Sequence, residues 1–142
     1  MAREGVGDAL RLLHRAIRPD GYLLDIHPEP EHARVLVVTA SGTQEVGQLD
    51  DSAYIADILA GRATIRTLVE AGLFVPVSER VFTHRLHASD VDSWLAHREE
   101  RATRSVLDPE IPRRARAILA DHPGEIQVVE RAHAGVFWVR RP

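Results

Sequence analysis

A helical repeat of apolar residues runs directly into a short apolar segment near the start of the chain, and this succession most constrains the fold. Apolar side chains recur every three or four residues over residues 6–17, which is the period of one face of a helix. Pro19 and Gly21 end that helix. The nearly continuous apolar run at residues 22–26 predicts a strand that is buried on both faces. A helix that leads into such a strand indicates an α/β protein with a parallel layer.

Strand and helix patterns alternate along the rest of the chain. A hairpin is predicted because the turn-forming residues 41–43 can connect the β-branched run at residues 33–39 to residues 44–49. Ser52 and Gly72 are residue types that begin and end helices, so they bound a long helix. The remaining predicted elements are a helix capped by Ser89, a helix that starts at Asp108 and Pro109, and strands over residues 33–39, 44–49, 126–132 and 135–140. Residues 73–77 and 81–88 are predicted to form one long strand or a bulged pair of strands, because Pro76 lacks a backbone donor. One domain spanning residues 1–142 has the length needed to bury a single core.

Composition excludes several classes of function. The chain has no cysteine, so it offers neither a disulfide, nor a thiolate metal ligand, nor a cysteine nucleophile. All 18 basic side chains are arginine, which excludes Schiff-base chemistry by lysine. A net charge of -3 gives no general attraction for nucleic acid, and no apolar run approaches the roughly 20 residues that a membrane-spanning helix needs. We therefore expect a cytoplasmic protein with neither a nucleic-acid nor a membrane partner.

One group among the eight histidines stands close to acidic residues. It consists of His27, Glu29, Glu31 and His32, at the end of the first predicted strand. Imidazole nitrogens and carboxylate oxygens are ligands that zinc and other divalent ions accept. The two prolines in the same stretch are typical of a loop, in which solvated acids are common. A metal site and an ordinary loop therefore both remain open at this point.

Two segments of the chain resemble class I S-adenosylmethionine-dependent methyltransferases. In that family a helix ends in a basic residue, a proline and a glycine before the fifth strand, as at Arg18, Pro19 and Gly21. Residues 68–74 are similar to the family's L-x-x-A-G-F passage into its sixth strand, and residues 91–96 with the terminal strands resemble the closing section of some members. The resemblance implies an α/β fold, namely a truncated Rossmann-like methyltransferase half with a mixed sheet and covering helices.

The resemblance also implies what this half would do. The family's cofactor-binding residues precede the segments that match here, so we expect no catalytic residue, no cofactor-binding residue and no binding of S-adenosylmethionine by the isolated chain. His27 and Glu29 are nominated as substrate-binding residues, because they follow the strand that matches the family's fifth, and open α/β sheets bind ligands beyond the ends of their strands. The implied function is a binding or assembly module.

Two alternatives stay open beside that function, and one of them is enzymatic. The chain could be the substrate-side half of a split methyltransferase, completed by another chain that carries the cofactor-binding half. It could instead be a small protein that binds a metal or another ligand through its histidines.

A half domain of this family would leave one edge of the strand at residues 22–26 without a neighbour. Open apolar edges pair with other chains unless something covers them. The hairpin within residues 33–49 is one candidate cover, and a second copy of the chain is another. We expect a homodimer, because a two-fold contact pairs the same edge in both copies and closes the assembly.

Overall fold

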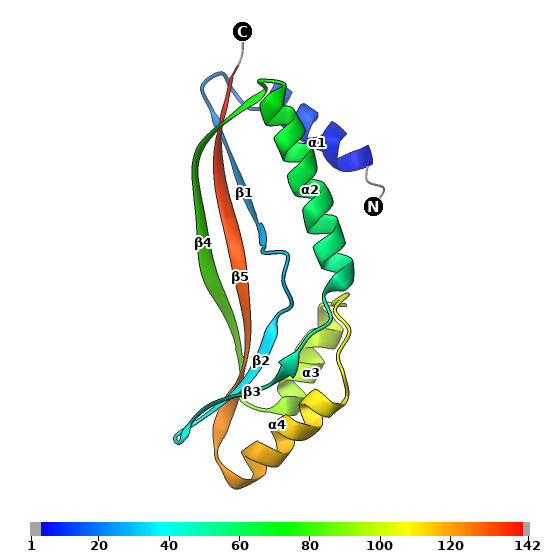
Figure 1. Ribbon diagram of the computed structural model, residues 1–142, viewed down its shortest axis with the longest axis vertical. Helices are drawn as coiled ribbons and strands as arrows, with labels where there is room; N and C mark the ends of the chain where they lie inside the picture. The colour runs from blue at the N-terminus through cyan, green and yellow to red at the C-terminus, as the bar shows by residue number, and fades with distance from the viewer. Residues whose placement is uncertain (1–3, 141–142) are drawn as a thin grey trace. The chain divides into compact units, whose positions relative to one another are not determined.

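The computed structural model describes residues 4–140 and shows four helices and five strands in that range (Figure 1). In chain order they are α1 (Glu4–Ala16), β1 (Tyr22–Pro28), β2 (Arg34–Thr39), β3 (Gly42–Gln48), α2 (Ser52–Glu70), β4 (Phe74–Ala88), α3 (Val91–Glu100), α4 (Glu110–Asp121) and β5 (Gly124–Val139). The chain is therefore α/β, as expected. No helix within the described range is both long and apolar enough to cross a membrane.

The described chain divides into two compact units. Unit 1 comprises residues 4–30, Ile55–Phe82 and residues 132–140. Unit 2 comprises Glu31–Tyr54 and Thr83–Arg131. Both β4 and β5 contribute residues to each unit.

Strand β5 pairs with three other strands. Its residues 132–138 pair antiparallel with β1, and its residues 124–129 pair antiparallel with β2. Strand β4 also pairs with β5, and β3 completes the order by pairing with β2. The expected parallel layer and mixed sheet are therefore wrong for the pairs of β1 and β2. A helix followed by a strand does not determine which strand becomes the neighbour, and here the neighbour of β1 is the last strand of the chain.

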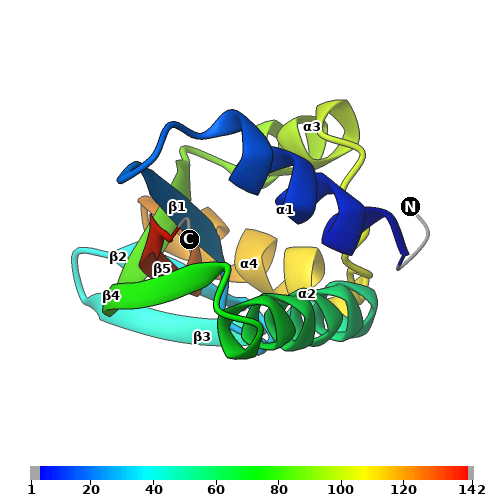
Figure 2. The same cartoon turned by 90° about the horizontal axis from the view of Figure 1, so that it is seen from above.

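In unit 1, both helices lie on the same side of the layer formed by β1, β4 and β5 (Figures 1 and 2). The core between them contains Leu68, Phe74, Phe137 and Val139, with Leu10, Ile17 and Leu23 packed against it. Helix α2 ends as expected at Gly72, which has a φ of 75°. There the N–H of Leu73 donates to the carbonyl of Leu68, which closes the helix end.

Strand β1 is not buried on both faces, which corrects the expectation from its apolar run. Side chains alternate along it, so Leu23 packs against the core while Leu24 is 59% exposed. Tyr22 and Ile26 share the face of Leu24 and are 63% and 58% exposed. The physical reason is that helices cover only one face of this part of the sheet (Figure 2).

In unit 2, the β2–β3 hairpin packs with α3 and α4 around a core of its own. Its largest fully buried side chains are Trp94, Val35, Val37 and Ile126. The hairpin is confirmed, but β2 pairs with β3 and β5 and not with β1. It does not pair with the edge of β1, as one alternative expected.

Two further expectations need correction, one for the start of α3 in unit 2 and one for strand β5. Asp90, and not Ser89, begins α3, because its carboxylate accepts the N–H of Ser93 at 2.7 Å. Hydrogen bonds from Ser93, followed by one from Ser89, lower the pKa of Asp90. The last part of the chain forms one strand, β5, where two were expected, because residues 132–134 keep their pairing with β1 and leave no turn.

The alternation of β1 predicts different costs for two adjacent leucines. We expect Leu23→Ala to lower the free energy of unfolding by about 2 kcal/mol, because it leaves a cavity in the core of unit 1. Leu24→Ala, the matched control, should lower it by no more than about 0.5 kcal/mol. Urea unfolding of both variants at low protein concentration measures the difference. Equal losses would contradict the assignment of the two faces.

Candidate metal centre

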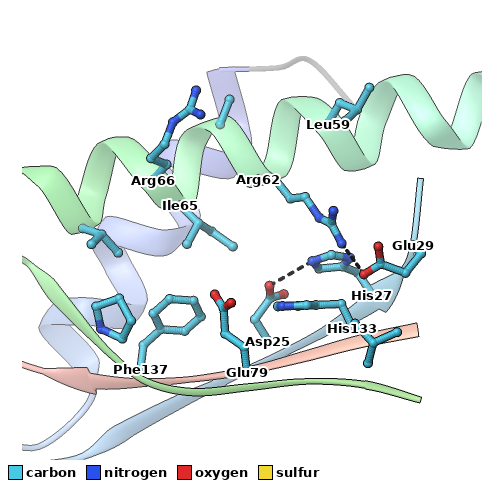
Figure 3. Close-up of a pocket in the computed structure, with 14 residues that line it drawn as sticks. Asp25, His27, Glu29, Leu59, Arg62, Ile65, Arg66, Glu79, His133 and Phe137 are labelled. Carbon is cyan, nitrogen blue, oxygen red and sulfur yellow. Dashed lines mark hydrogen bonds and ion pairs between the residues drawn. The ribbon is translucent and has the colours of Figure 1, made fainter. Parts of the chain in front are cut away.

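Three residues of metal-binding type meet on the inner face of the sheet in unit 1. Asp25 and His27 lie two positions apart on β1, so their side chains point to the same face. His133 on β5 is the direct register partner of His27. The two imidazole rings are stacked, with centroids 5.0 Å apart and planes inclined by 20°, and both lie beside Asp25 (Figure 3).

The spacing of the three side chains suits a single metal ion. One potential ligand atom from each of them lies within 4.8 Å of the other two. The Nε2 of His27 is 3.4 Å from Oδ2 of Asp25. Two ligands of a tetrahedral zinc ion, each about 2.1 Å from the metal, are separated by about 3.4 Å. The His27–Asp25 pair thus has the separation of two zinc ligands, and a potential ligand atom of His133 lies within 4.8 Å of the pair.

The hydrogen bond of His27 prepares its other nitrogen for a cation. Nδ1 of His27 lies 2.8 Å from the backbone carbonyl oxygen of Pro28. A carbonyl only accepts, so Nδ1 donates, and in the neutral ring Nε2 then carries a lone pair directed toward Asp25. Two electron-rich atoms in that position need a proton or a metal ion between them. Histidine ligands of metals commonly donate their second N–H to a carbonyl in this way.

One ring nitrogen of His133 has no hydrogen-bond partner among residues 4–140. Its Nδ1 is buried and forms no hydrogen bond with the residues that the structure describes. A buried polar atom without a partner costs about 1–3 kcal/mol of stability. Such an atom beside a carboxylate and a second imidazole is suited to binding a cation.

Gly135 gives the cluster its space. It is the register partner of Asp25 and lies between His133 and Phe137 on β5. A Cβ at this position would lie only 2.9 Å from Cε2 of Phe137 and 3.3 Å from Cε1 of His133. Glycine therefore leaves the space in front of Asp25 to the rings of His133 and Phe137, and a larger residue would clash with them.

The cluster opens into a cavity of about 720 Å³ within unit 1. Its walls come from β1, α2, β4 and β5, and they include Glu29, Leu59, Arg62, Ile65, Arg66, Val69, Glu79 and Phe137 (Figure 3). Arg62 reaches from α2 to Glu29, with Nη2 2.6 Å from Oε1. Cavities of about 300–1,000 Å³ are the usual size of small-molecule sites.

The residues nominated from the sequence have different surroundings in the structure. His27 and Glu29, the nominated substrate-binding residues, both line the cavity. Glu31 and His32 belong to unit 2 and have other partners there. His32 accepts the N–H of Asp51 at 3.0 Å, and Glu31 pairs with Arg131 at 3.5 Å. Of the four residues considered as metal ligands from the sequence, only His27 belongs to the cluster.

Sequence reasoning missed Asp25, His133 and Arg62. The two-residue spacing of Asp25 and His27 on a strand was a usable signal, because it places both on one face. His133 lies 106 positions beyond His27, and only the pairing of β5 with β1 brings them together. No local pattern marks Arg62, which meets Glu29 through the packing of α2.

Comparisons of the chain with protein-family models, curated proteins and solved structures found no match. The site is therefore interpreted from its own geometry.

The hydrogen bond of His27 predicts an unusual tautomer in the metal-free protein. We expect Nδ1 of His27 to carry the hydrogen of the neutral ring, because the carbonyl of Pro28 accepts it. The ¹⁵N chemical shifts of the ring, with assignment through His27→Gln, distinguish the two tautomers. A ring that is protonated at Nε2 alone would contradict this arrangement.

Proposed function

We propose that this protein binds a divalent transition-metal ion through Asp25, His27 and His133. The observation that carries the proposal is the convergence of three atoms that can donate an electron pair to a metal. The orientation of His27 by Pro28 and the unpartnered nitrogen of His133 support it. This function corresponds to the small histidine-based metal-binding protein considered from the sequence.

The ligand set indicates which metals the site would take. Two imidazoles and one carboxylate suit zinc, iron(II), nickel and similar ions, whereas calcium and magnesium prefer oxygen ligands. Three protein ligands leave at least one position of the metal free. Because the cluster lines the cavity, that position would be open to water or to a small ligand.

Metal binding should depend on all three side chains. We expect calorimetry to show one zinc or nickel ion per chain, and the variants His27→Ala, His133→Ala and Asp25→Ala each to weaken binding by roughly a hundredfold or more, since each removes a direct ligand. His122→Ala, which removes an exposed histidine of unit 2, should leave the affinity unchanged. Zinc should also raise the thermal unfolding midpoint, because it binds the folded state.

Two results would contradict the proposal. One is wild-type protein that gives neither binding heat nor a thermal shift with zinc or nickel. The other is retained affinity in His133→Ala together with loss in His32→Ala, which would place the ligands in unit 2.

A second candidate function, assembly through β1, is favoured by the exposed face of that strand. Strand β1 ends the strand order and, among residues 4–140, pairs only with β5. Tyr22, Leu24 and Ile26 present three large, exposed apolar side chains beside this free edge. We propose that a second copy of the chain pairs with it as a two-fold homodimer. The split-methyltransferase alternative would place a different chain, carrying the cofactor-binding half, at the same edge.

The homodimer predicts a solution mass near twice 15.8 kDa. Ile26→Arg should shift the protein to a monomer, because it places a charge in the apolar interface. Val106→Arg is the matched control, since Val106 is 63% exposed in unit 2 and lies outside β1. Light scattering at micromolar concentration measures all three proteins. A wild-type monomer would contradict the homodimer.

A further inference from the structure

We propose that the metal-loaded cavity binds a small organic monoanion, specifically a carboxylate with a short apolar tail. This inference rests on the proposed metal function and names the ligand that completes the site. Three features of unit 1 support it, namely the charge of the cavity, the free donors of Arg62 and the apolar end of the cavity.

The metal supplies the positive charge that an anion needs in this cavity. Three carboxylates line the cavity, from Asp25, Glu29 and Glu79, and the guanidinium of Arg62 faces them. Arg66 is also a lining residue, but its guanidinium points away from the sheet (Figure 3). A divalent ion would add two positive charges beside Asp25, and a bound metal is the largest local charge in such a site. The free position on the metal therefore favours an organic anion over a cation.

Arg62 can bind the carboxylate oxygen of such an anion that does not bind the metal. The structure shows one of its N–H groups, at Nη2, donating to Glu29. A guanidinium has five N–H donors, so others remain for a carboxylate. Arg62 and Glu29 are only 33% and 17% exposed, which fixes the guanidinium and strengthens its interaction with an anion. Glu29 thereby acts as a positioning residue for Arg62.

The opposite end of the cavity is suited to an apolar tail. Figure 3 places Ile65 and Phe137 on one side of Asp25, and Glu29 and Arg62 on the other. A carboxylate on the metal would therefore direct its carbon chain toward the two apolar side chains. The cavity, at about 720 Å³, is much larger than a metal ion with one water molecule requires.

Calorimetry with hexanoate, acetate and hexylamine as probes tests the ligand class. We expect hexanoate to bind the zinc-loaded protein at least tenfold more tightly than acetate, because its methylene groups are buried. Hexylamine has a comparable chain and the opposite charge, and it should not bind. Without zinc, hexanoate binding should be lost.

Two arginines of α2 provide matched variants. We expect Arg62→Gln to weaken hexanoate binding at least tenfold while zinc affinity stays within threefold of the wild type. Arg66 lies one helical turn further along α2 and points away from the sheet (Figure 3), so Arg66→Gln should weaken hexanoate binding less than threefold. If Arg62→Gln does not fold, Arg62→Lys retains the charge and should show an intermediate loss, because it lacks the planar pair of donors.

The outcomes separate this inference from the metal function. Full zinc binding without hexanoate binding would overturn the inference and leave the metal site in place. Equal hexanoate binding with and without zinc would overturn the role of the metal in anion binding. Absence of zinc binding would refute the proposed function itself and, with it, the metal-dependent ligand.

Discussion

The hydrogen-bond ladder of β5 is the constraint on which the rest of the structure depends. This strand of 16 residues pairs with β1, β2 and β4. The antiparallel register with β1 sets Gly135 opposite Asp25 and His133 opposite His27. Because side chains alternate along a strand, a shift of β5 by one residue would turn His133 to the other face of the sheet. The cluster of Asp25, His27 and His133 therefore exists only in this register.

One buried polar group in each unit shows a different degree of hydrogen bonding. In unit 2, Asp51 is 8% exposed, and its carboxylate accepts the N–H of Ala33 at 2.8 Å and the hydroxyl of Ser105. That acid is satisfied, and it connects the segment before β2 to the start of α2. In unit 1, Nδ1 of His133 has no partner among the described residues. Buried polar atoms are nearly always paired, so this exception supports the metal site proposed for unit 1.

The amphipathic and turn-forming parts of the sequence were predictable because their signals are local. Gly72 ends α2 through a positive φ, and Gly42, the first residue of β3, also has a positive φ directly after the turn at residues 40–41. The burial of β1 was predicted wrongly, because an apolar run does not reveal whether one or two faces are covered. The parallel layer was wrong for a related reason, since the order of elements along the chain does not specify which strands pair.

The sequence by itself determined the helices, most strands, the absence of thiol and lysine chemistry, and the shared face of Asp25 and His27. These properties depend on composition or on residues a few positions apart. The tertiary structure alone decided that His133 joins them, that Arg62 meets Glu29, and that the outer face of β1 is exposed. Each of these depends on contacts between distant segments, whose formation is governed by strand register and helix packing and is not encoded in any short stretch of sequence.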